Sequence, residues 1–114
     1  MKRLFLPLLL SIGLLNAGSY KTGEASAHIG ERATICGTVY GGYYAKSSRG
    51  RPTFLNLDGN YPHQRFTLVI WGNDRYRFNM PERSLKGQKV CATGTIGSYR
   101  GTPQIVLRSP SQLR

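Results

Sequence analysis

The chain carries five short segments with a β-strand signature, and only one stretch between them lacks it. In the first segment, Ile35 and Val39 alternate with Thr34 and Thr38, a period of two that is typical of a strand with one buried face. The two consecutive glycines that follow, at residues 41–42, permit a bulge or a sharp bend. The same β-branched and aromatic character predicts strands at residues 34–44, 53–57, 66–71, 89–98 and 103–107.

The stretch between the third and fourth strands is the exception. Asn73 or Asp74 is placed to cap a short helix, and Pro81 is expected to end it. A turn-rich segment separates the second and third strands, and residues 99–102 predict a hairpin turn between the last two. The order strand–strand–strand–helix–strand–strand therefore indicates one all-β domain.

The first residues have the order of a secretory signal peptide. Lys2 and Arg3 form a positive head, residues 4–15 are apolar, and small residues follow at 17–19. The apolar run is shorter than the roughly 20 residues that a spanning helix needs, which disfavours the alternative of a retained anchor. We expect a secreted or periplasmic protein with a signal peptide at residues 1–18, a flexible tether at 19–28 and a folded domain at 29–114.

The charge balance is strongly basic. The chain has 16 Lys and Arg residues against 5 Asp and Glu residues, a net charge of +11. Removal of Lys2 and Arg3 with the signal peptide leaves 14 basic and 5 acidic residues, a net charge of +9. A small domain with this excess should attract polyanions, although a basic and merely soluble surface is the alternative. Charge by itself does not distinguish nucleic acid from acidic glycan, lipid or protein.

Short phrases inside the predicted strands resemble a known architecture. They are ICGTV in the first strand, PTFLNLDG around the second, VCATGTI in the fourth and SYRGTPQIVL across the last hairpin. With the strand order, they resemble the OB-fold of tRNA-anticodon-binding domains, single-strand-binding proteins and helicases, over residues 29–109. The resemblance implies a five-stranded Greek-key OB-type barrel with one short helix between strands 3 and 4. It also implies a nucleic-acid ligand, although OB barrels hold oligosaccharides and proteins as well.

The two cysteines are expected to form a disulfide. An exported protein folds in an oxidising compartment, where an even number of cysteines favours pairing. Cys36 lies on the threonine side of the first strand, and Cys91 lies on the threonine side of the fourth. The first and fourth strands of an OB barrel are neighbours, so both thiols would share one outer face. The alternative is two unpaired thiols packed against threonines.

Catalytic groups are scarce in this sequence. None of the carboxylates forms a close pair suited to acid/base catalysis; they are Glu24, Glu31, Asp58, Asp74 and Glu82. A nuclease site built from two of these aspartates and Arg75 is the alternative, but turn and cap positions explain both aspartates better. The two histidines lack the spacing of metal ligands. We expect no enzyme activity, no metal and no cofactor.

The resemblance places a ligand on the second and third strands, framed by the loop after strand one and by the last hairpin. Binding a single strand needs cations that contact phosphates and flat aromatic faces on which bases stack. The candidate binding residues at these places are Tyr43, Tyr44, Lys46, Arg49, Arg51, Phe54, Asn56, Arg65, Trp71, Tyr99 and Arg100. Burial in the core is the competing interpretation of Phe54, and a position at the barrel end is that of Trp71.

These observations predict a protein that binds single-stranded nucleic acid, with DNA favoured over RNA and little sequence preference. The alternative is a protein- or glycan-interaction module of the cell envelope or the secreted space. Replacing Lys46, Arg49 and Arg51 with alanine should abolish polyanion binding in the first case. In the second case, a mainly apolar interface should remain largely intact.

Overall fold

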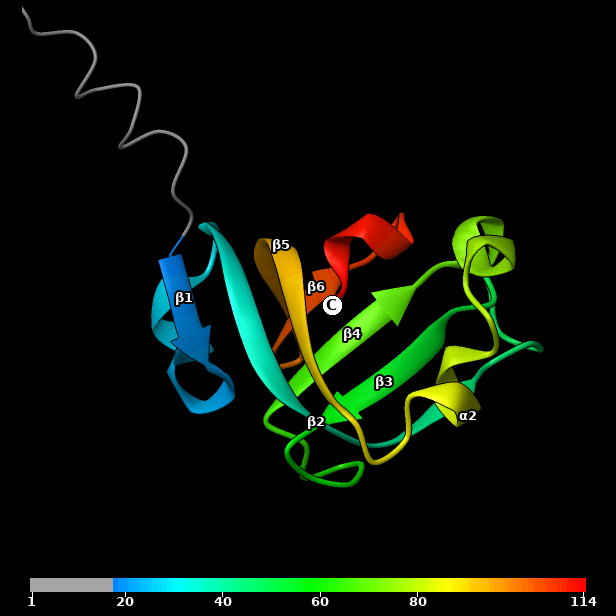
Figure 1. Ribbon diagram of the computed structural model, residues 1–114, viewed down its shortest axis with the longest axis horizontal. Coiled ribbons are helices and arrows are strands. Elements are labelled where there is room, and N and C mark those ends of the chain that lie inside the picture. Colours follow the sequence, from blue (N-terminus) through cyan, green and yellow to red (C-terminus); the bar gives the residue numbers. More distant parts are fainter. Residues whose placement is uncertain (1–17) are drawn as a thin grey trace, which may run out of the picture.

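The computed structural model describes residues 18–114, which form six strands and four short helical turns (Figure 1). The strands are β1 (Gly18–Lys21), β2 (Arg32–Tyr44), β3 (Thr53–Leu57), β4 (Phe66–Ile70), β5 (Lys89–Tyr99) and β6 (Thr102–Val106). The helical turns are η1 (Thr22–His28), η2 (Gly72–Arg77), α2 (Pro81–Ser84) and η3 (Pro110–Gln112). The all-β prediction is confirmed. The predicted signal peptide lies outside the described residues, apart from Gly18.

The strand pairings close into a ring. The sheet order is β1-β2-β3-β4-β6-β5, and β2 also pairs with β5, so β2, β3, β4, β6 and β5 form a closed ring with β1 outside it. The β4–β6 pair is parallel, whereas β2–β3, β3–β4, β5–β6 and β2–β5 are antiparallel. Strand β2 can serve both neighbours because its register shifts between Val39 and Gly41. Its first half then pairs with β5 and its second half with β3.

Apolar side chains fill the inside of the ring. Alternate residues of each strand point inward, as in Ile35, Leu55, Leu68 and Ile105, all of which are fully buried. Phe66 is the largest of these core side chains. Full burial of an apolar side chain of this size stabilises the fold by about 1.5–3 kcal/mol. Because successive side chains of a strand point to opposite faces, this gain favours turning the apolar set inward.

The predicted disulfide is confirmed. Cys36 and Cys91 are direct partners in the β2–β5 register, and their sulfur atoms are 2.02 Å apart. Two residues away on the same outer face, the hydroxyls of Thr34 and Thr93 lie 2.7 Å apart. The bond is consistent with folding in an oxidising compartment.

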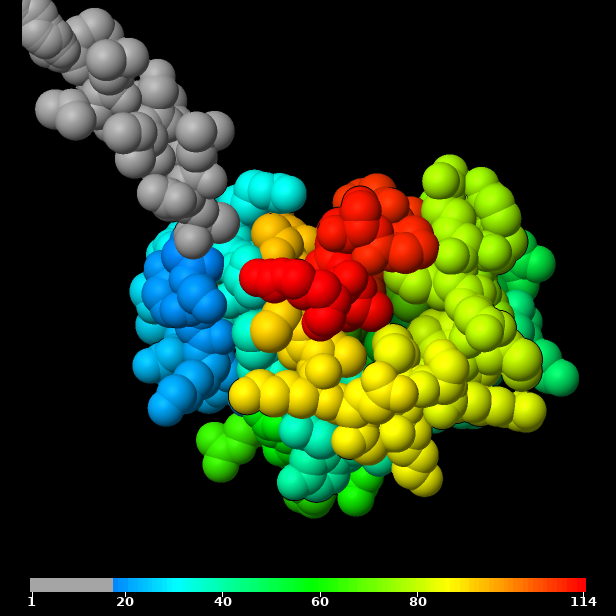
Figure 2. Space-filling view, in the orientation of Figure 1, coloured from blue at the N-terminus to red at the C-terminus, as the bar shows by residue number. Residues whose placement is uncertain are grey.

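Residues 19–28 were predicted to be a flexible tether, and this prediction is wrong. β1 pairs in parallel with β2 outside the closed ring, with Lys21 opposite Cys36. In η1, Ala25 is fully buried in the core, and the Thr22 hydroxyl donates to the Asp58 carboxylate at 2.7 Å. These contacts are made with residues far along the chain, so the local sequence gave no sign of them. Figure 2 shows this segment packed against one end of the molecule.

The single helix predicted between the third and fourth strands is replaced by two shorter turns. α2 begins at Pro81, the residue that was expected to end a helix. Proline fits this position because an N–H in the first helical turn has no intrahelical partner. Arg75 of η2 and Glu82 of α2 form two parallel hydrogen bonds of 2.9 Å each, which join the turns.

The C-terminal residues complete the fold by covering β5. Leu113 packs against the core, and the backbones of Cys91 and Arg114 exchange two hydrogen bonds, of 2.6 and 3.0 Å. Figure 2 shows this last segment lying across the face of the molecule. Residues 18–114 contain no helix with the length and apolar character needed to cross a membrane.

Candidate nucleic-acid interface

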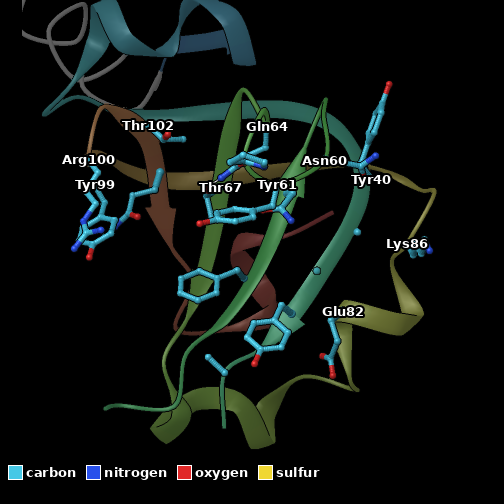
Figure 3. Close-up of a pocket in the computed structure, with 18 of the residues that line it drawn as sticks. Tyr40, Asn60, Tyr61, Gln64, Thr67, Glu82, Lys86, Tyr99, Arg100 and Thr102 are labelled. Atoms are coloured by element: carbon cyan, nitrogen blue, oxygen red, sulfur yellow. Dashed lines mark hydrogen bonds between the residues drawn. The ribbon is translucent and has the colours of Figure 1, made fainter. Parts of the chain in front are cut away.

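A broad open cleft of about 1160 Å³ lies on the outer face of β2, β3, β4 and β6. Three segments wall this cleft: the β3–β4 loop with Tyr61, the β5–β6 hairpin with Tyr99 and Arg100, and the α2 region with Arg83 and Lys86. Figure 3 shows the hairpin residues on one side of the cleft and Lys86 on the opposite side. The glycines of β2 keep its backbone close to β3, since a Cβ at Gly42 would lie 2.5 Å from the Phe54 carbonyl oxygen.

The floor of the cleft contains a row of polar side chains that crosses the sheet. Asn56 of β3 is the direct partner of Thr67 in β4, and Thr67 is the direct partner of Gln104 in β6. Gly41 of β2 extends the row on the other side of Asn56. Paired residues in a sheet point to the same face, so these side chains form one continuous row. We call Asn56, Thr67 and Gln104 the polar row.

An aromatic surface lies beside the polar row. Phe54 is two residues from Asn56 on the same face of β3, and its register partner in β2 is Tyr43. Phe54 is half-buried and lines the cleft, so it belongs to the outer face and not to the core. Four tyrosines around the cleft are exposed by 48 to 77%, and they are Tyr40, Tyr43, Tyr61 and Tyr99. Flat, accessible rings of this kind are what base stacking requires.

The cleft carries a positive charge because Glu82, the acidic residue that lines it, is neutralised by Arg75. Arg83, Lys86 and Arg100 line it without an ion pair among the described residues. Glu82 is held by Arg75, whose two hydrogen bonds lower the pKa of that carboxyl group. Arg75 also lies 3.7 Å from the centre of the Tyr44 ring and donates to Thr53.

The other acidic residues of the described chain are also engaged within the fold. Asp58 accepts hydrogen bonds from a threonine hydroxyl and from the Thr38 backbone N–H. Glu31 accepts from Tyr20 and lies 2.7 Å from His28; these two bonds lower the pKa of Glu31, the one to His28 more strongly. No group of three metal-binding side chains occurs in residues 18–114.

A smaller cavity of about 430 Å³ adjoins the cleft and shares Tyr43, Glu82 and Arg83 with it. It adds Tyr44 and Lys46 to the same surface. The adjoining cavity therefore extends the basic and aromatic surface past the end of β2.

The structure brings together seven of the eleven predicted binding residues. Five line the cleft: Tyr43, Phe54, Asn56, Tyr99 and Arg100. Tyr44 and Lys46 line the adjoining cavity. The other four predicted residues line neither cavity.

The positions of those four residues follow from local packing. The Trp71 ring packs over Gly50, where an added Cβ would lie 3.0 Å from it, and the backbone of Gly72 bonds to that of Gly50. Arg51 packs beside Gly72, and Arg65 reaches toward η1, whose Gly23 is close to its guanidinium. Arg49 is exposed in the same loop as Arg51.

Sequence reasoning missed several residues that line the cleft. They are Tyr40, Tyr61, Gln64, Thr67, Arg83, Lys86 and Gln104. Tyr40 had a usable signal, since it lies on the polar side of a strand already predicted to be half-buried. Tyr61, Gln64 and Lys86 lie between the regular elements, Arg83 lies in α2, and Thr67 lies in the uniformly buried β4. Gln104 lies on the less buried side of β6, and only its pairing with Thr67 places it in the cleft.

No family model matches this chain, and no curated protein matches its sequence. Among solved structures, the chain resembles part of a protein described as an aspartyl-tRNA synthetase from Leishmania major Friedlin, with a TM-score of 0.59 and 9% sequence identity. The match covers 87% of this chain and 20% of that one. At this identity the likeness concerns the fold alone.

Proposed function

We propose that this protein is an exported, non-catalytic OB-type barrel that binds single-stranded nucleic acid in the cleft over β2, β3, β4 and β6. The observation that carries the proposal is the convergence of exposed tyrosine rings and unpaired cations around one open surface. Aromatic rings stack on bases and cations contact phosphates, and these are the two requirements for binding a single strand.

The ring of strands supports the OB-type assignment. Without β1, the pairing β2-β3-β4-β6-β5, closed by β2–β5, has the five-stranded closed order of that barrel. The cleft lies on the second and third strands of this ring, and the closing hairpin borders it. This is the face on which OB barrels bind oligonucleotides. The shared fold with part of an aspartyl-tRNA synthetase agrees with a nucleic-acid ligand.

An unpaired strand fits the cleft better than a duplex does. Bases in a duplex are stacked on one another, so their faces are covered and cannot contact Tyr43 or Phe54. The walls also rise on opposite sides of the floor, from Arg100 to Lys86 (Figure 3). A single strand can lie between these walls with its bases toward the floor and its phosphates toward the cations.

A binding role without catalysis is favoured by the state of the carboxylates. Every acidic residue of the described chain is engaged in hydrogen bonds or ion pairs within the fold. Export is favoured by the signal-peptide pattern and by the disulfide, which persists in oxidising compartments.

The experiment compares matched pairs of variants by fluorescence anisotropy with labelled oligonucleotides of about 15 nucleotides, near the upper site size of one OB domain. Tyr61→Ala and Tyr76→Ala remove rings exposed by 77 and 76%, but only Tyr61 lines the cleft. Arg100→Ala and Arg108→Ala remove exposed cations, but only Arg100 lines the cleft.

We expect Tyr61→Ala to weaken binding about fivefold or more, because stacking contributes about 1–3 kcal/mol per base. Tyr76→Ala and Arg108→Ala should bind like the wild type. Single-stranded DNA, RNA, duplex DNA and heparin are compared at two salt concentrations. Tighter binding of heparin or duplex than of any single strand, or equal effects within each matched pair, would contradict the proposal.

A further inference from the structure

We infer that the polar row makes the cleft selective for the identity of a base, so that the protein prefers some single-stranded sequences over others. This inference rests on the proposed function, and it differs from the expectation of little sequence preference. Its starting point is that Asn56, Thr67 and Gln104 are direct neighbours across three strands at the bottom of the cleft.

The state of Asn56 is the strongest observation. Its side chain is 8% exposed, yet within residues 18–114 its amide makes no hydrogen bond to another protein group. The amide atoms are nevertheless not sealed off, since the only fully covered side-chain atom without a partner in this part of the chain is the Gln64 oxygen. An amide that reaches the cleft without a protein partner leaves one donor group and one acceptor available to a ligand there.

The Thr67 hydroxyl is a second polar group that can bind a ligand on the cleft floor. It is 7% exposed and accepts a hydrogen bond of 3.1 Å from the Gln64 amide. Its hydroxyl proton is therefore free to be donated to a ligand. The Gln104 amide, on the far side of Thr67, also makes no hydrogen bond to the described protein residues. The row thus presents an amide, a hydroxyl and a second amide in order.

The aromatic surface places a base next to this row. Phe54 and Asn56 are two residues apart on one face of β3, a distance of about 7 Å along a strand. A base stacked on Phe54 would therefore direct one edge toward Asn56 and Thr67. An amide presents a donor and an acceptor side by side, and this pairs well with a base edge.

The distribution of charge separates the two kinds of contact. The polar row contains no charged side chain, whereas the cations Arg83, Lys86 and Arg100 stand on the walls. Neutral donors and acceptors distinguish bases, while cations contact phosphates, which carry no sequence information. The cleft is therefore built to hold the backbone at its rim and to distinguish bases at its floor.

The test measures the affinities of fluorescein-labelled dT, dC and dA homopolymers of equal length for the wild type and three variants. Asn56→Leu and Gln104→Leu remove an amide while keeping most of the side-chain volume. Arg83→Ala removes a wall cation and serves as the control, and thermal unfolding checks that each variant folds. Gln104 is the less buried of the two amide positions, so its variant preserves the test if Asn56→Leu does not fold.

We expect the wild type to bind its preferred homopolymer at least about fivefold more tightly than the poorest one, the lower end for one good amide–base pair. Asn56→Leu and Gln104→Leu should each bring this ratio closer to one. Arg83→Ala should weaken all three ligands equally and leave the ratio unchanged. Equal wild-type affinities, or an unchanged ratio in both leucine variants, would overturn the inference while leaving the proposed function intact. Failure to bind any oligonucleotide would instead overturn the proposed function itself, and base selection with it.

Discussion

Salt should weaken the binding of a nucleic acid by an amount set by the number of cations that line the cleft. Five cations line the cleft and the adjoining cavity, and one of them, Arg75, is neutralised by its ion pair with Glu82. The four that make no ion pair among the described residues are Lys46, Arg83, Lys86 and Arg100. Each phosphate neutralised on a single strand contributes about −0.7 to the slope of log affinity against log salt. The wild type should therefore show a slope of about −2.8, which weakens binding about 50-fold between about 50 and 200 mM salt.

One substitution in the cleft distinguishes this surface from a uniformly basic protein. Arg100→Ala should lower the slope to about −2.1, because one phosphate contact is lost. Arg108→Ala removes the same charge at a position outside both cavities, so its slope should equal that of the wild type. If the net charge of the domain attracted the ligand without a defined site, the two variants would shift the slope equally.

The assay is anisotropy of a labelled poly-dT strand, titrated with protein at four or more salt concentrations. The slope is read from the affinities and does not depend on the probe concentration. A wild-type slope shallower than about −1 would mean that fewer than two phosphates are neutralised, and the assignment of the four cations would then be wrong.

Three further predictions concern the stability of the fold. Replacing Cys36 and Cys91 with serine should lower the free energy of unfolding by about 4 kcal/mol, because their bond closes a loop across a separation of 55 residues. Urea denaturation measures this loss, and a loss under about 1 kcal/mol would contradict the prediction. The lowered pKa of Glu82 means that its ion pair stabilises the fold above the ordinary value of 4.5, and that this contribution is lost as the pH falls through the lower, folded-state pKa. Glu82→Gln should therefore cost about 2 kcal/mol at pH 7 and flatten this acid dependence, whereas an unchanged pH profile would rule out the role of Arg75. Asp58→Ala removes the acceptor of two hydrogen bonds and should reduce stability by about 2 kcal/mol, and amide hydrogen exchange should show η1 opening first.

The strands were predictable because the residue types and their alternation within each segment are enough to identify it. The second strand was placed at residues 53–57, as observed, since its inward residues Leu55 and Leu57 alternate with Phe54 and Asn56. The cysteine pair followed from the even cysteine count in a chain expected to be exported. Parity agreed with it, because both cysteines lie on the threonine side of strands that are neighbours in the barrel that the sequence resembles.

The docked N-terminal segment could not be predicted in the same way. Its sequence is small and polar, and it has a single core residue, Ala25. The order of this segment depends on Asp58 and Glu31, which its own sequence does not reveal. Pro81 begins a helical turn, and the pairing of its neighbour Glu82 with Arg75 joins that turn to η2, a contact that the local sequence does not reveal.

The cleft was partly predictable. The sequence identified the aromatic and basic residues at the end of β2 and in the last hairpin, because these types stand out by composition. It did not identify Thr67, because every residue of β4 is buried and the sequence does not show which side chains face outward. It did not identify Gln104, because the parallel pairing of β4 with β6 that aligns Gln104 with Thr67 joins segments far apart in the chain. The sequence thus identified part of the floor, including Asn56, and part of the walls, but it missed Arg83 and Lys86 as well as Thr67 and Gln104.

The closure of the ring by β2 and β5 also sets the order in which this fold can form. Cys36 of β2 and Cys91 of β5 are 55 residues apart in the sequence. Bringing the two strands together therefore costs chain entropy, and this cost arises before the burial of the core can offset it. Folds dominated by such distant pairings assemble slowly. Once Cys36 and Cys91 are oxidised, β2 and β5 stay together, and the rest of the ring completes itself over shorter distances. The oxidised chain should therefore refold much faster than the reduced chain, and the cysteines act on the rate of assembly as well as on the final stability.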